Sequence, residues 1–192
     1  MIAIIKYNGG NVNSVQNALN RLDEKSIITD DFELIQKADK VIFPGVGEAS
    51  STMKLLKEKG LDQLIPKLTQ PVLGICLGMQ LMCGNNEEGN TVGMGIFDIN
   101  IKKFPTENIV PHMGWNTISG LKSSLFSEIS EEDDFYFVHS YYCELSDFTT
   151  SVCDYILPFS ATLEKDNFFA TQFHPEKSGK IGNQLLKNFL KI

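Results

Sequence analysis

The sequence predicts an α/β fold, with a mixed, mostly parallel sheet flanked by helices and a strand-rich C-terminal half. In the first half, short apolar runs typical of buried strands alternate with segments whose apolar residues have helical spacing. From Met94 onward, short β-like runs follow one another instead. A chain of 192 residues, 42% of them hydrophobic, is long enough for one sizeable core and short for two. We therefore expect one domain spanning residues 1–192.

The first half of the chain is predicted to consist of βα units. Residues 2–6 form an apolar run typical of a strand, and residues 11–22 carry a helical stripe with Asn11 as its N-cap. The same alternation continues with a strand at 26–29, a helix at 32–38, a strand at 40–43, a helix at 50–59 ended by Gly60, and a helical segment at 61–68 interrupted by Pro66. This alternation predicts a parallel sheet with helices covering both faces.

The second half is predicted to be rich in strands. Residues 84–93 are polar and glycine-rich, which predicts a loop rather than a regular element. The β-like runs that follow are 95–101, 115–118, 134–139 and 151–157, with 160–163 paired to 168–173 across a turn at 165–167. The chain then ends in a predicted helix, 178–192, that would pack its apolar residues on the core.

The stretch 71–80, Pro-Val-Leu-Gly-Ile-Cys-Leu-Gly-Met-Gln, predicts a nucleophile at the end of a buried strand. Gly74 and Gly78 flank Cys76 in the G-x-nucleophile-x-G pattern of a strand-to-helix turn. Such a turn strains the backbone of the nucleophile and leaves room beside it only for residues without a Cβ atom. A helix starting at Leu77 would direct free backbone amides at the thiol and at a substrate oxygen. Because ligands bind at the carboxyl ends of parallel strands, the loop 44–47 could face the same site.

A thiol nucleophile needs a base, and the chain has three histidines. His174 follows the predicted strand 168–173 and precedes Glu176 by two residues. On an extended segment this spacing puts both side chains on one side, so that the carboxylate can orient the imidazole while its other nitrogen faces the thiol. The expected triad is therefore Cys76, His174 and Glu176. His112 and His139 stay alternatives as the base, although neither has a carboxylate at that spacing.

Composition excludes several classes of protein. A net charge of -7 and a pI near 5.0 argue against a nucleic-acid surface, which needs clustered Lys and Arg. The apolar start of the chain is too short for a signal sequence, and no apolar run approaches the ~20 residues of a membrane span. The four cysteines and three histidines have neither disulfide-scaffold nor metal-ligand spacing. We expect a soluble cytoplasmic protein without a metal or cofactor.

Several segments resemble a known enzyme family. The segments 74–80, Gly-Ile-Cys-Leu-Gly-Met-Gln, and 173–176, Phe-His-Pro-Glu, resemble the motifs of the class I (triad) glutamine amidotransferases. Four others resemble one subfamily, the glutaminase subunits of imidazole glycerol phosphate synthases: Pro-Gly-Val-Gly at 44–47, Pro-His-Met-Gly-Trp-Asn at 111–116, Phe-Val-His-Ser-Tyr at 137–141 and Pro-Glu-Lys-Ser at 175–178. The resemblance covers nearly the whole chain.

This resemblance implies the fold of that family and a role in histidine biosynthesis. Members hydrolyse glutamine and pass the ammonia to a (β/α)8-barrel cyclase subunit, in a heterodimer. The cyclase then forms imidazole glycerol phosphate and an aminoimidazole carboxamide ribotide.

The resemblance also implies roles for individual residues. Cys76 would form a glutamyl thioester, His174 would be the acid and base, and Glu176 would orient it. The amide of Leu77 and the loop of Val46 and Gly47 would form the oxyanion hole. The implied glutamine-binding residues are Gly47, Gln80, Glu88, Ser140 and Tyr141, and a carboxylate at Glu88 suits the substrate ammonium. The implied interface with the cyclase comprises His112, Met113, Trp115, Asn116 and Lys177.

The sequence departs from the family pattern at one place. The first strand ends in Lys6-Tyr7-Asn8, where relatives often have an acidic residue.

Other functions fit parts of the sequence. A triad glutaminase of pyridoxal phosphate biosynthesis is similar, but has a G-G-E-S loop where this chain has Gly-Val-Gly-Glu at 45–48, and lacks the Trp115 motif. A paralogue supplying ammonia to a synthase of sugar or surface-polysaccharide biosynthesis is harder to separate. The alternative from another class is a non-catalytic flavodoxin-like binding module, in which Cys76 would be an unreactive core thiol.

Overall fold

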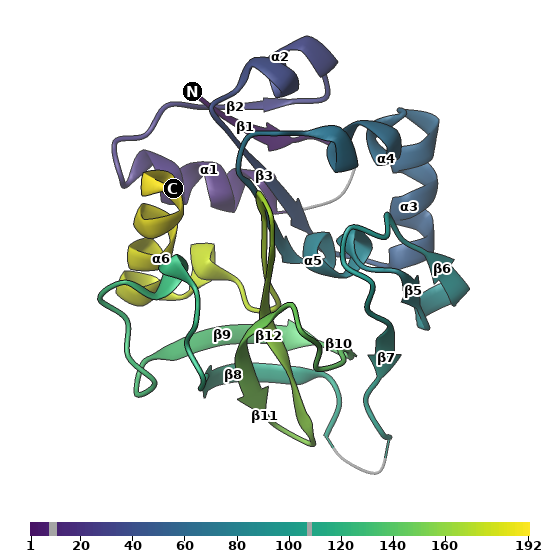
Figure 1. The fold of residues 1–192 in the computed structure, drawn as a ribbon, viewed down its shortest axis with the longest axis vertical. Coiled ribbons are helices and arrows are strands. Elements are labelled where there is room, and N and C mark those ends of the chain that lie inside the picture. The colour runs from purple at the N-terminus through teal and green to yellow at the C-terminus, as the bar shows by residue number, and fades with distance from the viewer. Residues whose placement is uncertain (8–10, 107–108) are drawn as a thin grey trace.

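The computed structural model describes residues 1–7, 11–106 and 109–192. Its centre is a seven-stranded sheet with the strand order β11-β12-β13-β4-β3-β1-β2 (Figure 1). The parallel strands are β1 (Ile2–Ile5), β2 (Ser26–Thr29), β3 (Lys40–Gly45), β4 (Val72–Cys76) and β13 (Phe168–Thr171). At one edge, β12 (Pro158–Lys165) and β11 (Thr149–Asp154) pair antiparallel. The predicted mixed, mostly parallel sheet is confirmed.

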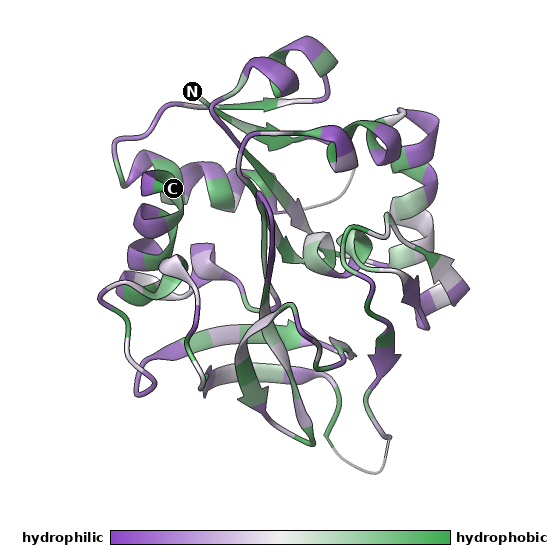
Figure 2. Cartoon of the chain, viewed as in Figure 1, coloured by the Kyte–Doolittle hydropathy of each residue, from purple (hydrophilic) through white to green (hydrophobic). Residues whose placement is uncertain are grey.

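Helices cover both faces of this sheet, because alternate side chains of the buried strands point to opposite sides. On one face, Ile2 and Ile4 belong to a core cluster with α1 (Val12–Asn20) and α6 (Gly179–Lys191). On the other, Ala3 and Ile5 pack in a cluster with α2 (Phe32–Lys37), α3 (Ala49–Glu58), α4 (Leu61–Leu64) and α5 (Leu77–Met82). Figure 2 shows the hydrophobic (green) central strands, with hydrophilic (purple) turns on the outer sides of the helices.

Two smaller sheets lie beside the main one. A four-stranded sheet has the order β10-β7-β5-β6, formed by Tyr141–Cys143, Ile101–Lys103, Asn85–Asn86 and Thr91–Val92. The second is the antiparallel pair of β8 (His112–Thr117) and β9 (Asp134–His139). In Figure 1 this pair lies below the main sheet. Short 3-10 turns at Ile65–Lys67, Glu88–Asn90, Ser124–Phe126 and Pro175–Lys177 complete the described elements.

Two predicted segments are wrong in part. Residues 84–93 are not a plain loop, since they contain β5, a 3-10 turn and β6. The strand expected at 95–101 starts only at Ile101. The amides of Met94 and Ile96 instead donate to the carbonyls of Leu81 and Met82 at 2.8 and 2.9 Å. The end of α5 therefore satisfies backbone groups that a neighbouring strand would otherwise satisfy.

The helix α1 starts after Asn11, but the side chain of Asn11 makes no capping hydrogen bond. Its Nδ2 atom donates instead to Oε1 of Glu176 at 3.5 Å, across the fold. The predicted capping role of Asn11 is therefore wrong, and a tertiary contact replaces it.

The first strand was noted above for ending in Lys6-Tyr7-Asn8 where relatives often have an acidic residue. Asn8 lies outside the described residues.

Among the described residues, none of the helices has the length and apolar character needed to cross a bilayer.

Candidate active site

Cys76 lies at the strained turn between β4 and α5. It is the last residue of β4, and α5 begins at the next residue, Leu77. The backbone of Cys76 has φ 53° and ψ -109°, a conformation that residues with a side chain rarely adopt. The predicted strand-to-helix turn at Cys76 is thus present.

Glycines allow β3, β4 and α5 to approach closely at this turn. A Cβ atom on Gly78 would overlap the carbonyl oxygen of Phe43, and one on Gly74 would overlap Sδ of Met82. A Cβ atom on Gly45, at the end of β3, would lie 2.6 Å from the backbone nitrogen of Gly78. The helix can therefore start against the sheet only because Gly45 and Gly78 lack side chains, whereas a Cβ atom on Gly74 would displace the flexible side chain of Met82.

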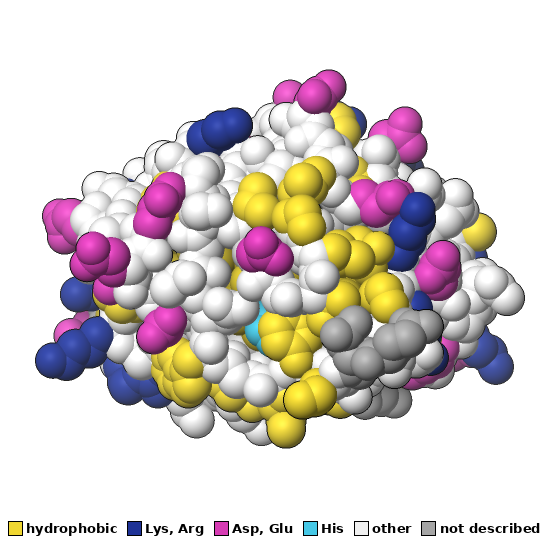
Figure 3. All heavy atoms as spheres, turned by 90° about the horizontal axis from the view of Figure 1, so that it is seen from below, with side chains coloured by type: hydrophobic (Ala, Val, Ile, Leu, Met, Phe, Trp, Pro, Cys, Tyr) yellow, Lys and Arg dark blue, Asp and Glu magenta, His cyan; other side chains and the backbone are white. Residues whose placement is uncertain are grey.

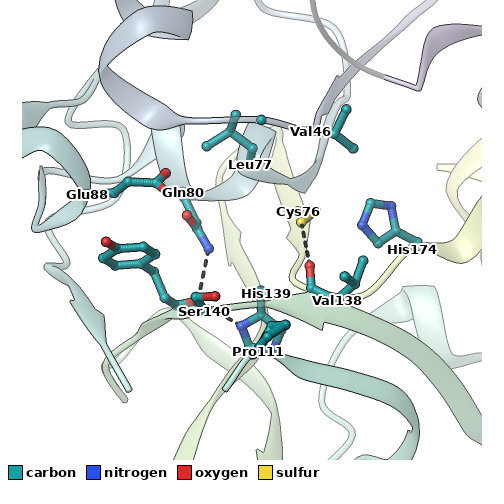
Figure 4. A pocket seen from close by; sticks show the side chains of 12 residues that line it. Val46, Cys76, Leu77, Gln80, Glu88, Pro111, Val138, His139, Ser140 and His174 are labelled. Carbon is teal, nitrogen blue, oxygen red and sulfur yellow. Dashed lines mark hydrogen bonds between the residues drawn. The ribbon is translucent and has the colours of Figure 1, made fainter. Parts of the chain in front are cut away.

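The thiol of Cys76 faces a cavity of about 380 Å³ at the carboxyl ends of β3 and β4 (Figure 4). Its walls come from six parts of the chain. They are the loop after β3, the turn and helix at α5, the 3-10 turn Glu88–Asn90, the residue before β8, the end of β9 with the start of β10, and the segment after β13. The lining residues are Val46, Gly47, Cys76, Leu77, Gln80, Glu88, Pro111, Val138, His139, Ser140, Tyr141 and His174.

The imidazole of His174 is oriented by Glu176. Its Nδ1 atom lies 2.8 Å from Oε1 of Glu176, and both side chains are buried. The 3-10 turn Pro175–Lys177 brings the carboxylate back to the ring. Since Nδ1 is held by the carboxylate, Nε2 is left without a hydrogen-bond partner among the described residues.

His174 also interacts electrostatically with the thiol. Burial by itself would lower the pKa of His174, but the negative charges of Cys76 and Glu176 outweigh it and raise that pKa above its usual value. The surroundings of His174 therefore favour its imidazolium form. In Figure 4, Cys76 and His174 lie at one end of the cavity, and Gln80 and Glu88 lie at the other.

The other predicted substrate-binding residues line the same cavity. The Nε2 atom of Gln80 donates to the carbonyl oxygen of Tyr141 at 3.0 Å. One carboxylate oxygen of Glu88 accepts a hydrogen bond from the amide of Ala49, 2.8 Å away, at the start of α3. Burial, followed by the nearby charge of Glu48, raises the pKa of Glu88 despite that bond. Gly47 has a φ of +107° and no atom within 4 Å of a Cβ position, so its conformation and not crowding favours glycine.

Two of the histidines have different surroundings from His174. His139 lines the cavity, but its Nδ1 atom is 2.7 Å from the carbonyl oxygen of Tyr141 and its Nε2 atom is 3.0 Å from Nδ1 of His112. Burial lowers the pKa of His139 to about 3 and that of His112 to about 4, so both rings are neutral at pH 7. Neither ring has a carboxylate partner among the described residues, which leaves His174 as the best-placed base.

The residues expected at a partner interface fall into two groups. Met113 and Trp115 of β8 are exposed by 66% and 56%, and Lys177 is also exposed. Asn116 is half-buried. His112 is only 3% exposed, because its side chain points to the opposite face of β8, where its ring stacks on Tyr155. A surface role for the side chain of His112 is therefore contradicted.

Sequence reasoning missed several residues that line the cavity or lie behind Cys76. Pro111 and Val138 line it, and the carbonyl oxygen of Val138 lies 3.8 Å from Sγ of Cys76. Gln172 is fully buried, with its Nε2 atom 3.7 Å from the same sulfur. One signal for Gln172 was available: on the strand predicted at 168–173, a residue two positions before His174 would share its side.

The fold and this cysteine turn are those of a class I glutamine amidotransferase, and the chain belongs to that family: the family model "Glutamine amidotransferase class-I" matches residues 4–192. A glutamine amidotransferase from Thermotoga maritima has a similar fold, with a TM-score of 0.64 at 15% identity over 99% of this chain and 82% of that one. Two relatives indicate the subfamily within this class. They are the imidazole glycerol phosphate synthase subunits HisH of Bacteroides fragilis and Bacteroides thetaiotaomicron, which are 59% and 58% identical to this chain over 100% of its length and 99% of each relative. Within the class, the chain belongs to the HisH family.

Proposed function

We propose that this chain is the glutaminase subunit of an imidazole glycerol phosphate synthase, which hydrolyses glutamine to glutamate and ammonia. The observation that carries the proposal is the strained Cys76, whose thiol shares one cavity with the His174–Glu176 pair. A core thiol in a binding module would have no reason to occupy a strained turn beside an oriented imidazole.

In the first half of the reaction, the thiolate of Cys76 attacks the carbonyl carbon of the glutamine side-chain amide. The amides of Leu77 and of the loop at Val46 and Gly47 stabilise the resulting oxyanion. His174, protonated and held by Glu176, donates its Nε2 proton to the leaving nitrogen, so ammonia departs and a thioester remains.

In the second half, His174 takes a proton from water, which attacks the thioester carbon. The carbon–sulfur bond breaks, glutamate leaves, and the imidazolium and thiolate are restored. The new carboxylic acid loses its proton to solvent, so glutamine and water become glutamate, ammonia and a proton, with no net change in the protein.

Substrate selection follows from the far end of the cavity. The half-buried carboxylate of Glu88 suits the α-ammonium group of glutamine. Gly47, Gln80, Ser140 and Tyr141 surround the remainder of the substrate.

The ammonia would pass to a HisF-like cyclase, a (β/α)8 barrel, within a heterodimer. Figure 3 shows hydrophobic side chains gathered on the face seen from below, which β8, β9 and β11 form in Figure 1. Met113 and Trp115, which are exposed on the outer side of β8, belong to this docking face. Large exposed aromatic residues in such a patch are typical of an interface.

The test of the catalytic assignment is Cys76→Ala, assayed as glutamate release with the cyclase partner and its ligand present. Turnover should fall by about 10⁴-fold or more, because triad members act as a unit. The matched control is Cys153→Ala, which deletes a buried thiol in β11 outside the cavity and should keep most of the activity. Retained turnover in Cys76→Ala would refute the proposal.

A further inference from the structure

We propose that Gln172 is a further catalytic residue, whose side-chain amide donates a hydrogen bond to the thiolate of Cys76. This inference rests on the proposed function, in which Cys76 is the nucleophile. Gln172 forms no bond to substrate and exchanges no proton, so it acts only by holding the negative sulfur.

The contacts of Gln172 connect the nucleophile to the substrate-binding side of the cavity. Its Nε2 atom lies 3.7 Å from Sγ of Cys76, within hydrogen-bond range for sulfur. Its Oε1 atom accepts from Nε2 of Gln80 at 3.0 Å. Gln172 is fully buried, so water does not compete for either contact.

The orientation of the Gln172 amide follows from its neighbours. The carbonyl oxygen of Tyr141 can only accept a hydrogen bond, so the atom of Gln80 that lies 3.0 Å from it must be the amide nitrogen. That same nitrogen lies 3.0 Å from the Gln172 amide, which must therefore present its oxygen there. Turning the Gln172 amide around would set two NH₂ groups against each other. Its own N–H groups are thus left to point at Cys76.

An amide is suited to this task. A donated hydrogen bond favours the charged form of a buried sulfur, and hydrogen bonds to charged groups are stronger than those between neutral groups. Unlike His174, an amide cannot take up or release the proton, so it stabilises the thiolate without competing in the proton transfers. The contact is therefore available throughout the catalytic cycle.

A purely structural role for Gln172 makes different predictions. Gln172→Met keeps the length of the side chain and removes the donor, while Gln80 keeps its bond to Tyr141. Gln172→Glu keeps an acceptor for Gln80 and replaces the amide nitrogen with an oxygen. If Gln172 only packed or satisfied Gln80, Gln172→Met would alter the melting temperature but not the reactivity of the thiol. Gln172→Glu also adds a negative charge beside the sulfur, which by itself disfavours the thiolate, so Gln172→Met is the deciding variant.

The experiment measures the rate at which iodoacetamide alkylates Cys76 in the full chain, at pH values between 5 and 10. Mass spectrometry of the Cys76 peptide monitors the reaction. Cys83, Cys143 and Cys153 are fully buried and serve as unreactive references in the same digest. His174, Tyr7 and Cys143, which interact electrostatically with Cys76, are unchanged in every variant. The distant control is Gln184→Met on α6, whose partner is Asn188.

We expect the midpoint of the alkylation curve to rise by about one pH unit in Gln172→Met and at least as far in Gln172→Glu, with no change in Gln184→Met. In the complex, kcat should fall by about tenfold and KM should change little. Unchanged midpoints in folded Gln172 variants, with a wild-type Cys76 that glutamine protects from alkylation, would overturn the role of Gln172 alone. A wild-type Cys76 that reacts no faster than the three references would overturn both proposals.

Discussion

At the scale of single residues, the donor and acceptor roles in a series of buried hydrogen bonds keep His112 and His139 neutral. His139 must donate through Nδ1 to the Tyr141 carbonyl, so its Nε2 atom accepts from His112. The remaining ring nitrogen of His112 faces the amide of Asn116 at 3.5 Å. A proton added to either ring would have to break this series or place an unpaired charge in the core.

Protonation of these two rings should therefore make stability depend on pH. The pKa values of His112 and His139 are lowered from 6.5 to about 4 and about 3, chiefly by burial. Between pH 6.5 and about 4, the unfolded chain binds protons that the folded chain does not, so the free energy of unfolding falls as the pH falls. The raised pKa of His174 has the opposite effect: its contribution is complete below pH 6.5 and is lost as the pH rises.

The measurement is urea unfolding of the wild type and His112→Gln at pH 7.0 and 5.0. Removing one titrating ring should reduce the loss of stability over this interval by about 1–2 kcal/mol. His174→Gln is the matched comparison and should increase the loss instead. Equal losses in wild type and His112→Gln would contradict the neutral pair.

At the scale of elements, the site depends on the close crossing of α5 over β3 and β4. The crossing has no room for a side chain at Gly78, where a Cβ atom would overlap the carbonyl oxygen of Phe43. Since that carbonyl belongs to the backbone of β3, the overlap cannot be relieved by a change of rotamer. The helix would have to move, and Cys76 with it.

Gly78→Ala should accordingly cost about 3 kcal/mol of stability and most of the glutaminase activity. Gly120→Ala is a suitable control, because Gly120 has a φ of +67° and no atom within 4 Å of a Cβ position. It should cost only the backbone strain, about 1 kcal/mol. Denaturant unfolding of both variants tests this ranking, and a Gly78→Ala cost no larger than the Gly120→Ala cost would contradict it.

At the scale of the whole molecule, the proposed docking face and the cavity at Cys76 share the same pair of strands. On the outer side, the rings of Trp115 and Tyr136 are 5.9 Å apart, and Nζ of Lys177 lies 5.8 Å from the Tyr136 ring. On the inner side, His139 at the end of β9 lines the cavity. A partner bound to the docking face would thus contact the strands that form one wall of the site.

Trp115→Ala should weaken the complex with the cyclase partner by about 2 kcal/mol, or roughly 30-fold in Kd, because an exposed aromatic residue in a docking patch is a common binding hot spot. The unfolding free energy should change little, since Trp115 is 56% exposed. Titration calorimetry measures the affinity, with Val92→Ala as a control because Val92 is 63% exposed on β6, away from β8 and β9. The docking face would be misassigned if Val92→Ala weakened binding as much as Trp115→Ala.

The sequence by itself determined the features that depend on short spacings. The alternation of strands and helices, the turn at Cys76 with its glycines, and the His174–Glu176 pair all involve residues within a few positions of each other, and the structure contains each of them. Steric limits on the backbone and the periods of helix and strand act at this range, so a sequence pattern expresses them directly.

Only the tertiary structure decided how distant segments meet. Gln172 contacts the sulfur of Cys76, which is 96 residues away in the sequence. Asn11 donates to Glu176, 165 residues away, instead of capping the helix that follows it. His112 turned inward because the neighbouring residues of β8 occupy the outer face, and residues 94–97 bond to the end of α5 rather than forming a strand. Each of these outcomes depends on which groups come into contact when the layers pack, and no local pattern encodes that contact.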